Sequence, residues 1–221
     1  MTLFKQGYCN QNSASCISFI KKFTTKTLRN TKKKNMTDEE KNPWTILAEK
    51  KIYSNTWIEL TEADVLNPSG GKGIYSVVHF HNYAIGILAL DEDNNTYLVG
   101  QYRFPLNQYS WEIPEGGGDK KLTPLESARR ELLEECGIVA REWTQLMETH
   151  LSNSATDEHG ILFLARGLSF TTSSPDETEK LQVRKLPFAE VYNMVCNGSI
   201  TDALTQLAVM KVKLMIDEGK I

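Results

Sequence analysis

Residues 110–139 have the sequence SWEIPEGGGDKKLTPLESARRELLEECGIV. This segment predicts a short strand, a glycine turn and then a helix loaded with carboxylates. Thr123 is a favourable N-cap, Pro124 suits the first helical position, and Glu126 completes a capping box. Gly137 is the expected stop, because glycine takes up a left-handed backbone at little cost. The segment therefore predicts one well-delimited helix between Pro124 and Gly137.

The predicted helix has two distinct faces. Its apolar positions recur at helical spacing and form one stripe: Leu125, Ala128, Leu132 and Cys136. Glu131, Glu134 and Glu135 fall within an arc of roughly 100° on another side. Carboxylates this close repel one another, and a hard divalent cation such as Mg²⁺ removes that repulsion. A solvated acidic face paired with Arg129 and Arg130 is the alternative, but the cap, the glycines and the arginine spacing together favour a metal site.

The same segment closely resembles the Nudix box, G-x5-E-x7-R-E-U-x-E-E-x-G-U, where U is aliphatic. Gly116 takes the first position, and Arg130 to Ile138 match the second half without a gap. The box thus spans residues 116–138. One position departs from the motif, since Leu122 stands where the first glutamate belongs. In the family that glutamate mainly supports the motif arginine, and Glu126, four residues before Arg130, could pair with it instead.

The whole chain has 221 residues, 40% of them hydrophobic, with a formal charge of −3. These totals suit one globular domain with extensions. No apolar run approaches the ~20 residues that span a bilayer. The near-neutral charge gives no electrostatic reason to expect nucleic-acid binding. Four scattered cysteines, without metal-ligand spacing, indicate a reducing compartment without disulfides, and we expect a cytoplasmic protein.

The first 40 residues differ from the rest of the chain. They are basic and rich in hydroxyl side chains, and the first acid is Asp38. Such a composition is typical of an organellar transit peptide over residues 1–35. Alternatively, Met36 is the true start of the protein. In either case we predict a disordered extension over residues 1–40 without a catalytic part, followed by the catalytic domain at 41–221.

From about Trp44 the pattern is typical of strands. Residues 56–65 and 74–80 predict a hairpin, and residues 83–90 and 96–103 predict a second strand pair across the turn at 91–95. Further strands are predicted at 143–150, 161–165 and 181–185. Helices are predicted from Leu186-Pro187 to about Cys196 and from Thr201-Asp202 to about Glu218. These elements indicate an α+β fold. The resemblance implies the Nudix α/β/α sandwich with an extra N-terminal β unit at about 44–80.

Three stretches outside the box resemble the ADP-ribose and nucleoside-diphosphate-sugar pyrophosphatases. Residues 99–105 contain Arg103, which the resemblance directs at the substrate phosphates. Residues 111–117 contain Glu112, which would face the metals, and Glu115, whose backbone carbonyl would be a ligand where the group usually has alanine. Residues 150–158 end in Glu158, an acid that activates water or binds metal in a mobile loop. In that loop Asn153-Ser154 replaces the Pro-Gly of the group.

The resemblance also implies a reaction. Mg²⁺, or Mn²⁺ in its place, would be held by Glu131 and Glu135 with help from Glu134, Glu112 and the Glu115 carbonyl. Glu158, Glu134 and Arg130 are the predicted catalytic residues, and Arg103 and Trp57 the predicted substrate-binding ones. Hydrolysis of the diphosphate of ADP-ribose or a related sugar nucleotide would follow. Another diphosphate substrate, such as GDP-mannose or a dinucleotide, and a non-catalytic nucleotide-sugar-binding module are the alternatives.

The resemblance bears on assembly, and the spacing of the histidines bears on a zinc site. The related pyrophosphatases pair through their N-terminal unit, so the resemblance implies a homodimer. Residues 44–80 have too little apolar surface to be stable alone, which supports that expectation. The four histidines at 79, 81, 150 and 159 share no spacing, and we expect them to be strand and surface residues rather than zinc ligands.

Deletion of residues 1–35 is expected to leave catalysis and melting temperature unchanged, because this segment has little apolar surface to bury. Enzyme assays and thermal melts of the shortened and full-length proteins would test this. A fall in either quantity would show that the basic segment docks on the domain.

Overall fold

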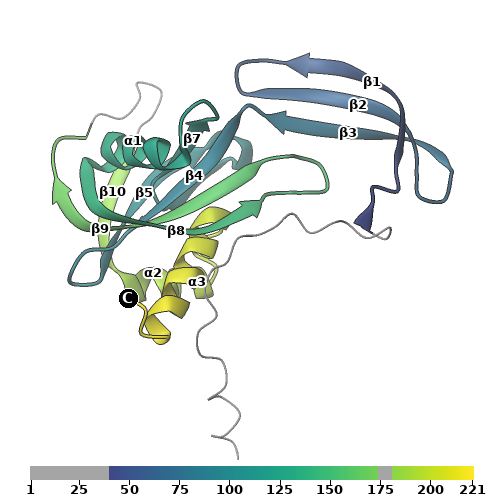
Figure 1. Cartoon of the computed structure of the whole chain (residues 1–221). Coiled ribbons are helices and arrows are strands. Elements are labelled where there is room, and N and C mark those ends of the chain that lie inside the picture. Colours follow the sequence, from purple (N-terminus) through teal and green to yellow (C-terminus); the bar gives the residue numbers. More distant parts are fainter. Residues whose placement is uncertain (1–39, 174–180) are drawn as a thin grey trace, which may run out of the picture. The chain divides into compact units, whose positions relative to one another are not determined.

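The computed structural model describes residues 40–173 and 181–221. The predicted basic extension over residues 1–40 lies outside these ranges, apart from its last position. Residues from Pro43 onward form one compact unit (Figure 1). Of the helices in the described ranges, none has the length and apolar character needed to cross a membrane.

The N-terminal unit is a sheet of three antiparallel strands, β1 (Thr45–Ser54), β2 (Ile58–Leu66) and β3 (Lys72–Phe80), in that order. The predicted hairpin of β2 and β3 is confirmed. Its turn is organised by Asn67, whose side chain accepts hydrogen bonds from the backbone N–H groups of Ser69 and Gly71 at 3.0 and 2.9 Å. The asparagine side chain thus replaces backbone partners that the turn leaves without one.

A second sheet has the strand order β7-β4-β9-β8. Its strands are β4 (Asn82–Ala89), β7 (Glu115–Asp119), β8 (Ile138–His150) and β9 (His159–Phe170). Strand β4 runs parallel to β9 and antiparallel to β7. A third sheet has the order β10-β5-β6, from β5 (Asn95–Arg103), β6 (Gln108–Glu112) and β10 (Gln182–Pro187). A short 3₁₀ turn, η2 (Phe104–Leu106), joins β5 to β6.

The predicted pairing of residues 83–90 with 96–103 was wrong. Both strands exist, but β4 lies between β7 and β9, and β5 lies between β10 and β6. Only a single bridge, Leu90 to Thr96, links them across the turn. Asp91 shapes this corner: its carboxylate accepts from the Asn95 N–H at 2.7 Å and pairs with Lys185 at 2.7 Å. Adjacency in sequence therefore marks a change of sheet here and not a hairpin.

The predicted glycine turn after Glu112 was also wrong. Residues Glu115–Asp119 form strand β7, which pairs with β4. Helix α1 (Pro124–Cys136) packs directly over this strand. A side chain at Gly118 would overlap Ile85 and crowd Ser127 of the helix. The glycines therefore allow a helix and a strand to approach closely.

The predicted helix ends are confirmed. The Thr123 hydroxyl accepts from the Glu126 N–H, and the Glu126 carboxylate accepts from the Thr123 N–H at 2.8 Å. Gly137 ends α1 with a φ of 63°. Helix α2 (Phe188–Cys196) and helix α3 (Ala203–Asp217) match the two predicted C-terminal helices, and the Asp202 carboxylate accepts from the Thr205 N–H at 2.6 Å.

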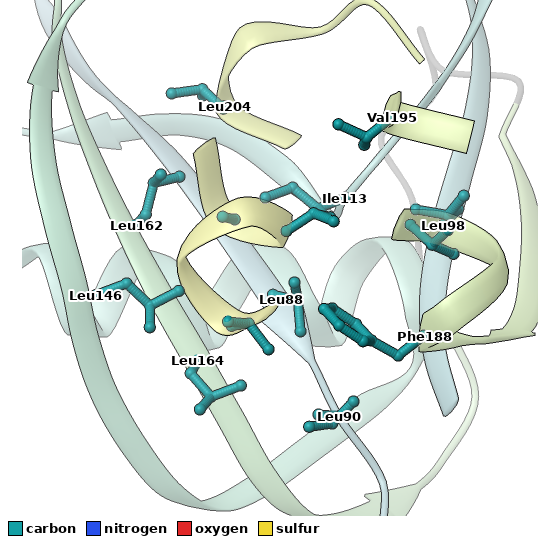
Figure 2. Close-up of a cluster of buried hydrophobic side chains, with 14 of the residues drawn as sticks. Leu88, Leu90, Leu98, Ile113, Leu146, Leu162, Leu164, Phe188, Val195 and Leu204 are labelled. Atoms are coloured by element: carbon teal, nitrogen blue, oxygen red, sulfur yellow. The ribbon is translucent and has the colours of Figure 1, made fainter. Parts of the chain in front are cut away.

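The two central strands of the four-stranded sheet, β4 and β9, are buried on both faces. Alternate residues of β4 point to opposite sides: Ile85 and Ile87 pack with Ala128 and Leu132 of α1, whereas Leu88 packs with side chains of α2 and α3. Figure 2 shows this second cluster, in which Leu88, Leu162 and Leu164 of the sheet lie near Phe188, Val195 and Leu204 of the helices. The α/β/α sandwich and the α+β class predicted from the sequence are confirmed.

Replacing Leu88 by alanine is expected to lower the free energy of unfolding by about 2–5 kcal/mol, because the side chain is fully buried and a cavity would remain. Leu214→Ala is the matched control, since Leu214 is 53% exposed on α3. Its change should stay within about 0.5 kcal/mol. Denaturant unfolding of both variants measures the difference, and equal effects would contradict the assignment of the core.

Candidate active site

A cavity of about 560 Å³ lies where β3, β6, β7 and the start of α3 meet. Four acids line it: Glu112, Glu115, Glu158 and Asp202. Arg103 and Trp57 line it as well. Five of these six residues were predicted site residues, and residues from 57 to 202 of the sequence therefore converge on one cavity.

Arg103 lies at the centre of the charged wall. Its Nε donates to both carboxylate oxygens of Glu112 at 3.0 Å, and its Nη2 donates to Glu112 and to Glu115 at 2.6 Å. Burial alone would lower the pKa of the guanidinium, but the bonds to Glu112 and the charges of both acids raise it above its ordinary value. The predicted phosphate-facing arginine is thus engaged with two carboxylates of the protein itself.

Three carboxylates gather around this arginine. Oxygen atoms of Glu112, Glu115 and Asp202 lie within 4.8 Å of one another. One oxygen of Glu115, Oε2, is buried without a hydrogen-bond partner. Burial, followed by the nearby charges of Asp202 and Glu112, raises the pKa of Glu115 well above the usual range. Here the Glu115 side chain enters the site, where the resemblance assigned only its carbonyl.

Asp202 is a site residue that the sequence analysis missed. It was assigned only as the cap of the last helix, a role confirmed by its bond to Thr205. A helix cap faces the end of its helix, and here that end opens onto the cavity. The Thr205 hydroxyl in turn accepts from the Ile113 N–H at 2.9 Å, which ties α3 to the segment between Glu112 and Glu115. No motif of the sequence could have signalled this contact.

The box carboxylates Glu131 and Glu135 project from α1 onto the backbone of β7. Both are buried, at 8% and 3% exposure. Glu135 accepts a hydrogen bond from the Glu115 N–H at 3.0 Å. A side chain at Gly116 would overlap the carboxylate of Glu131. Gly116 is therefore the position at which the strand makes room for a box acid.

Arg130 and Glu134 lie at the exposed edge of this arrangement. Arg130 donates to Glu134 at 2.6 Å, to Glu131 at 2.5 Å and to the Gly117 carbonyl at 3.0 Å. The suggested pairing of Glu126 with Arg130 is not the one formed, because the Glu126 carboxylate is engaged by Thr123 in the capping box. Leu122 is 46% exposed. Arg130 is thus oriented by Glu134 and by the β7 backbone.

Glu158 and Trp57 complete the cavity wall from other elements. Glu158 follows the turn between β8 and β9, and burial raises the pKa of its carboxyl. Trp57 lies in the turn between β1 and β2 and is 67% exposed. Its indole is therefore available for stacking, while Glu158 presents a carboxyl of increased basicity to the same cavity.

The donor set of this site fits a divalent cation. Three carboxylates could together hold a metal ion, those of Glu112, Glu115 and Asp202. The Glu135 carboxylate lies next to this group, because it accepts a hydrogen bond from the Glu115 N–H. The buried, unpartnered Oε2 of Glu115 leaves an acceptor that a cation would satisfy. Carboxylate oxygens of this kind suit Mg²⁺ or Mn²⁺ rather than softer ions.

The fold and this site define a Nudix hydrolase, and the chain belongs to the NUDIX domain family, whose model matches residues 80–202. A second family model, the nucleoside diphosphate sugar hydrolase N-terminal domain, matches residues 44–78. The N-terminal β unit expected at about 44–80 is therefore a recognised module that precedes the Nudix domain.

Two relatives and one solved structure are similar to this chain over about three quarters of its length or more. The chain is 31% identical to the ADP-ribose pyrophosphatase of Bacillus subtilis (strain 168) over 170 residues, which cover 76% of this chain and 91% of the relative. It is 32% identical to the methanol dehydrogenase activator of Bacillus methanolicus over 165 residues, covering 74% and 89%. A crystal structure of ADP compounds hydrolase has the same fold, with a TM-score of 0.72 at 21% identity, covering 80% of this chain and 97% of that one.

Replacing Gly116 by alanine is expected to weaken Mn²⁺ binding and lower activity, because the new methyl group would displace the Glu131 carboxylate. Gly73→Ala provides the matched control, since a side chain there meets no atom within 4 Å. Calorimetric titration with Mn²⁺ and a turnover assay measure both effects. Wild-type metal affinity in Gly116→Ala would show that Glu131 does not need its present position.

Proposed function

We propose that this Nudix hydrolase cleaves the diphosphate bond of ADP-ribose or a related nucleoside-diphosphate sugar, releasing a nucleoside monophosphate and a sugar phosphate. The observation that carries the proposal is the single cavity lined by Trp57, Arg103 and the acids Glu112, Glu115 and Glu158. It offers an aromatic face for a base, a guanidinium for phosphate and carboxylates for divalent ions. The activity named for the Bacillus subtilis relative agrees with this assignment.

Glu131, Glu135 and Glu112, with the Glu115 carbonyl and help from Glu134, would hold Mg²⁺ or Mn²⁺. We add the side chains of Glu115 and Asp202 to this set, because they lie within ligand reach of Glu112. When bound, such ions screen the negative phosphate oxygens and lower the pKa of bound water. They would also relieve the repulsion among the buried acids.

The other residues bind and orient the substrate and accept a proton. Arg103 presents a planar fork of N–H donors that suits a diphosphate, and Trp57 would stack on the base. Glu158 would accept the proton of the attacking water at its carboxylate, a role that the raised pKa of this buried carboxyl favours. Arg130 keeps Glu131 and Glu134 in place through its two nitrogens.

The two alternative functions differ from this proposal in testable ways. A binding module without catalysis would lack box carboxylates, whereas Glu131, Glu134 and Glu135 are all present. A different diphosphate substrate would use the same metals and arginine but another fit around Trp57. A substrate panel separates these functions directly.

The panel consists of ADP-ribose, ADP-glucose, UDP-glucose, GDP-mannose and diadenosine diphosphate, each with Mg²⁺ and phosphatase-coupled detection of the monophosphate products. We expect the highest kcat/KM with ADP-ribose or another sugar nucleotide. A preference for the dinucleotide would contradict the substrate assignment, and turnover of none of these compounds would contradict the catalytic one.

Glu135→Gln is expected to lower kcat by roughly 100-fold or more. Loss of a residue that only supports a metal ligand costs up to about 100-fold, and loss of a ligand itself should cost at least as much. The fold should persist, because a glutamine oxygen can still accept from the Glu115 N–H. Glu190→Gln, an exposed position on α2, is the control. Near-normal turnover of Glu135→Gln at saturating Mg²⁺ would remove Glu135 from the ligand set.

We also propose that the enzyme is a homodimer joined through its N-terminal sheet. All ten residues of β1 are exposed, and they include Ile46, Leu47, Ile52 and Tyr53 at 50–59% exposure. Ile74 on β3 is 66% exposed. An apolar surface of this kind on one sheet is typical of a subunit interface.

Light scattering of the protein without residues 1–35 is expected to show a dimer, with an interface burying well over ~1,000 Å². Changing Ile46 and Ile52 to lysine should yield monomers, because charges in an apolar interface are costly. Lysine at Val183 (45% exposed on β10) is the control, since it lies outside the N-terminal sheet. A fully active monomer at micromolar concentration would refute the proposal.

A further inference from the structure

We propose that Asp157 and His79 are positioning residues that fix Glu158 through strand β3. The inference rests on the proposed role of Glu158 as the base. It goes further in assigning the N-terminal sheet a part in catalysis within its own chain. The contacts between residues 151–158 and β3 carry the argument.

Backbone bonds attach the turn that precedes Glu158 to β3. Val78 donates to the Ala155 carbonyl at 2.9 Å, and Asp157 donates to the Val78 carbonyl at 3.2 Å. Val78 and Thr156 form a parallel bridge. The Tyr75 hydroxyl donates to the Ser154 carbonyl at 2.7 Å. The turn before Glu158 is therefore attached to strand β3 by backbone bonds and by the Tyr75 hydroxyl.

The side chain of Asp157 secures this attachment at its end. One oxygen accepts from the Phe80 N–H at 2.8 Å, and the other meets His79 Nδ1 at 2.7 Å. The second ring nitrogen of His79 bonds to the Thr61 hydroxyl on β2 at 3.0 Å. Although partial burial alone would raise the pKa of Asp157, the bonds from Phe80 and His79 lower it. The ionised Asp157 carboxylate thus binds the end of β3 through Phe80 and the imidazole of His79, which is also held by Thr61.

Glu158 depends on this attachment for its own position. It lines the cavity together with Phe80, whose N–H binds Asp157. Among the described residues, none donates a hydrogen bond to the Glu158 carboxylate, and burial raises the pKa of this carboxyl. Its placement therefore comes from the backbone, and its neighbour Asp157 is the side chain that fixes that backbone. A catalytic group needs such support to stay within about 0.5 Å of its working position.

A double-mutant cycle distinguishes positioning from general stabilisation. Asp157→Ala is expected to lower kcat by about 10–100-fold, as the loss of an outer-shell support does, with KM and Mn²⁺ affinity unchanged. In a Glu158→Gln background the same change should have no further effect, because the base that Asp157 positions is already absent. Asp157→Asn should recover part of kcat, since an amide can still accept from Phe80 and donate to His79.

Asp217→Ala is the matched control, because Asp217 forms an exposed ion pair with Lys213 on α3. It should leave kcat unchanged. If Asp157→Ala does not fold, His79→Phe enters the same cycle in its place. Hydrogen exchange at the Val78 and Asp157 amides should become faster in either variant.

Each outcome of the cycle has a separate meaning. Equal losses from Asp157→Ala in the wild-type and Glu158→Gln backgrounds would overturn the positioning inference while leaving Glu158 as the base. Unchanged kcat in Asp157→Ala would overturn it as well. Full activity of Glu158→Gln would instead overturn the base assigned under the proposed function, and the positioning inference with it.

Discussion

The close contact between helix α1 and strand β7 is the constraint on which the site depends. Gly116 and Gly118 lack side chains where Glu131 and Ser127 approach, so the helix can lie directly on the strand. Two box glutamates then reach the strand backbone, and Glu135 accepts from the Glu115 N–H. Any larger residue at Gly116 would separate the helix acids from the acids that β6 and β7 supply. The glycines of the motif, which lie within strand β7, therefore serve the packing of carboxylates.

That packing concentrates negative charge around Arg103. Glu112, Glu115 and Asp202 surround one guanidinium, and the raised pKa of Glu115 reflects burial with too few positive partners. In this arrangement the protein holds its acids at the cost of mutual repulsion. Bound cations would relieve the repulsion and release Arg103 toward a phosphate. Metal binding and the freedom of Arg103 to bind phosphate would therefore depend on each other, because both depend on the charge of the same carboxylates.

Much of this could be predicted from sequence, because the signals were local. The caps at Thr123 and Gly137, the helix faces and the Nudix box depend on residues within about one helix length. The prediction that β4 pairs with β5 was wrong, because the short turn between them does not reveal that both strands have other partners. The site role of Asp202 and the contact of His79 with Asp157 were not predicted for a related reason. Their significance arises from contacts between residues far apart in the sequence, 78 positions in the case of His79 and Asp157.

The cap at Gly137 has one more consequence. Strand β8 begins at Ile138, so a single residue separates helix α1 from the sheet. The Gly137 carbonyl also accepts from Thr171 at the end of β9. The C-terminal end of helix α1, where Glu134 and Glu135 lie, is consequently held close to the sheet. Because the last turn of α1 is already ordered, ligand binding there would cost little further conformational entropy. Less of the binding free energy would then be spent on ordering the protein.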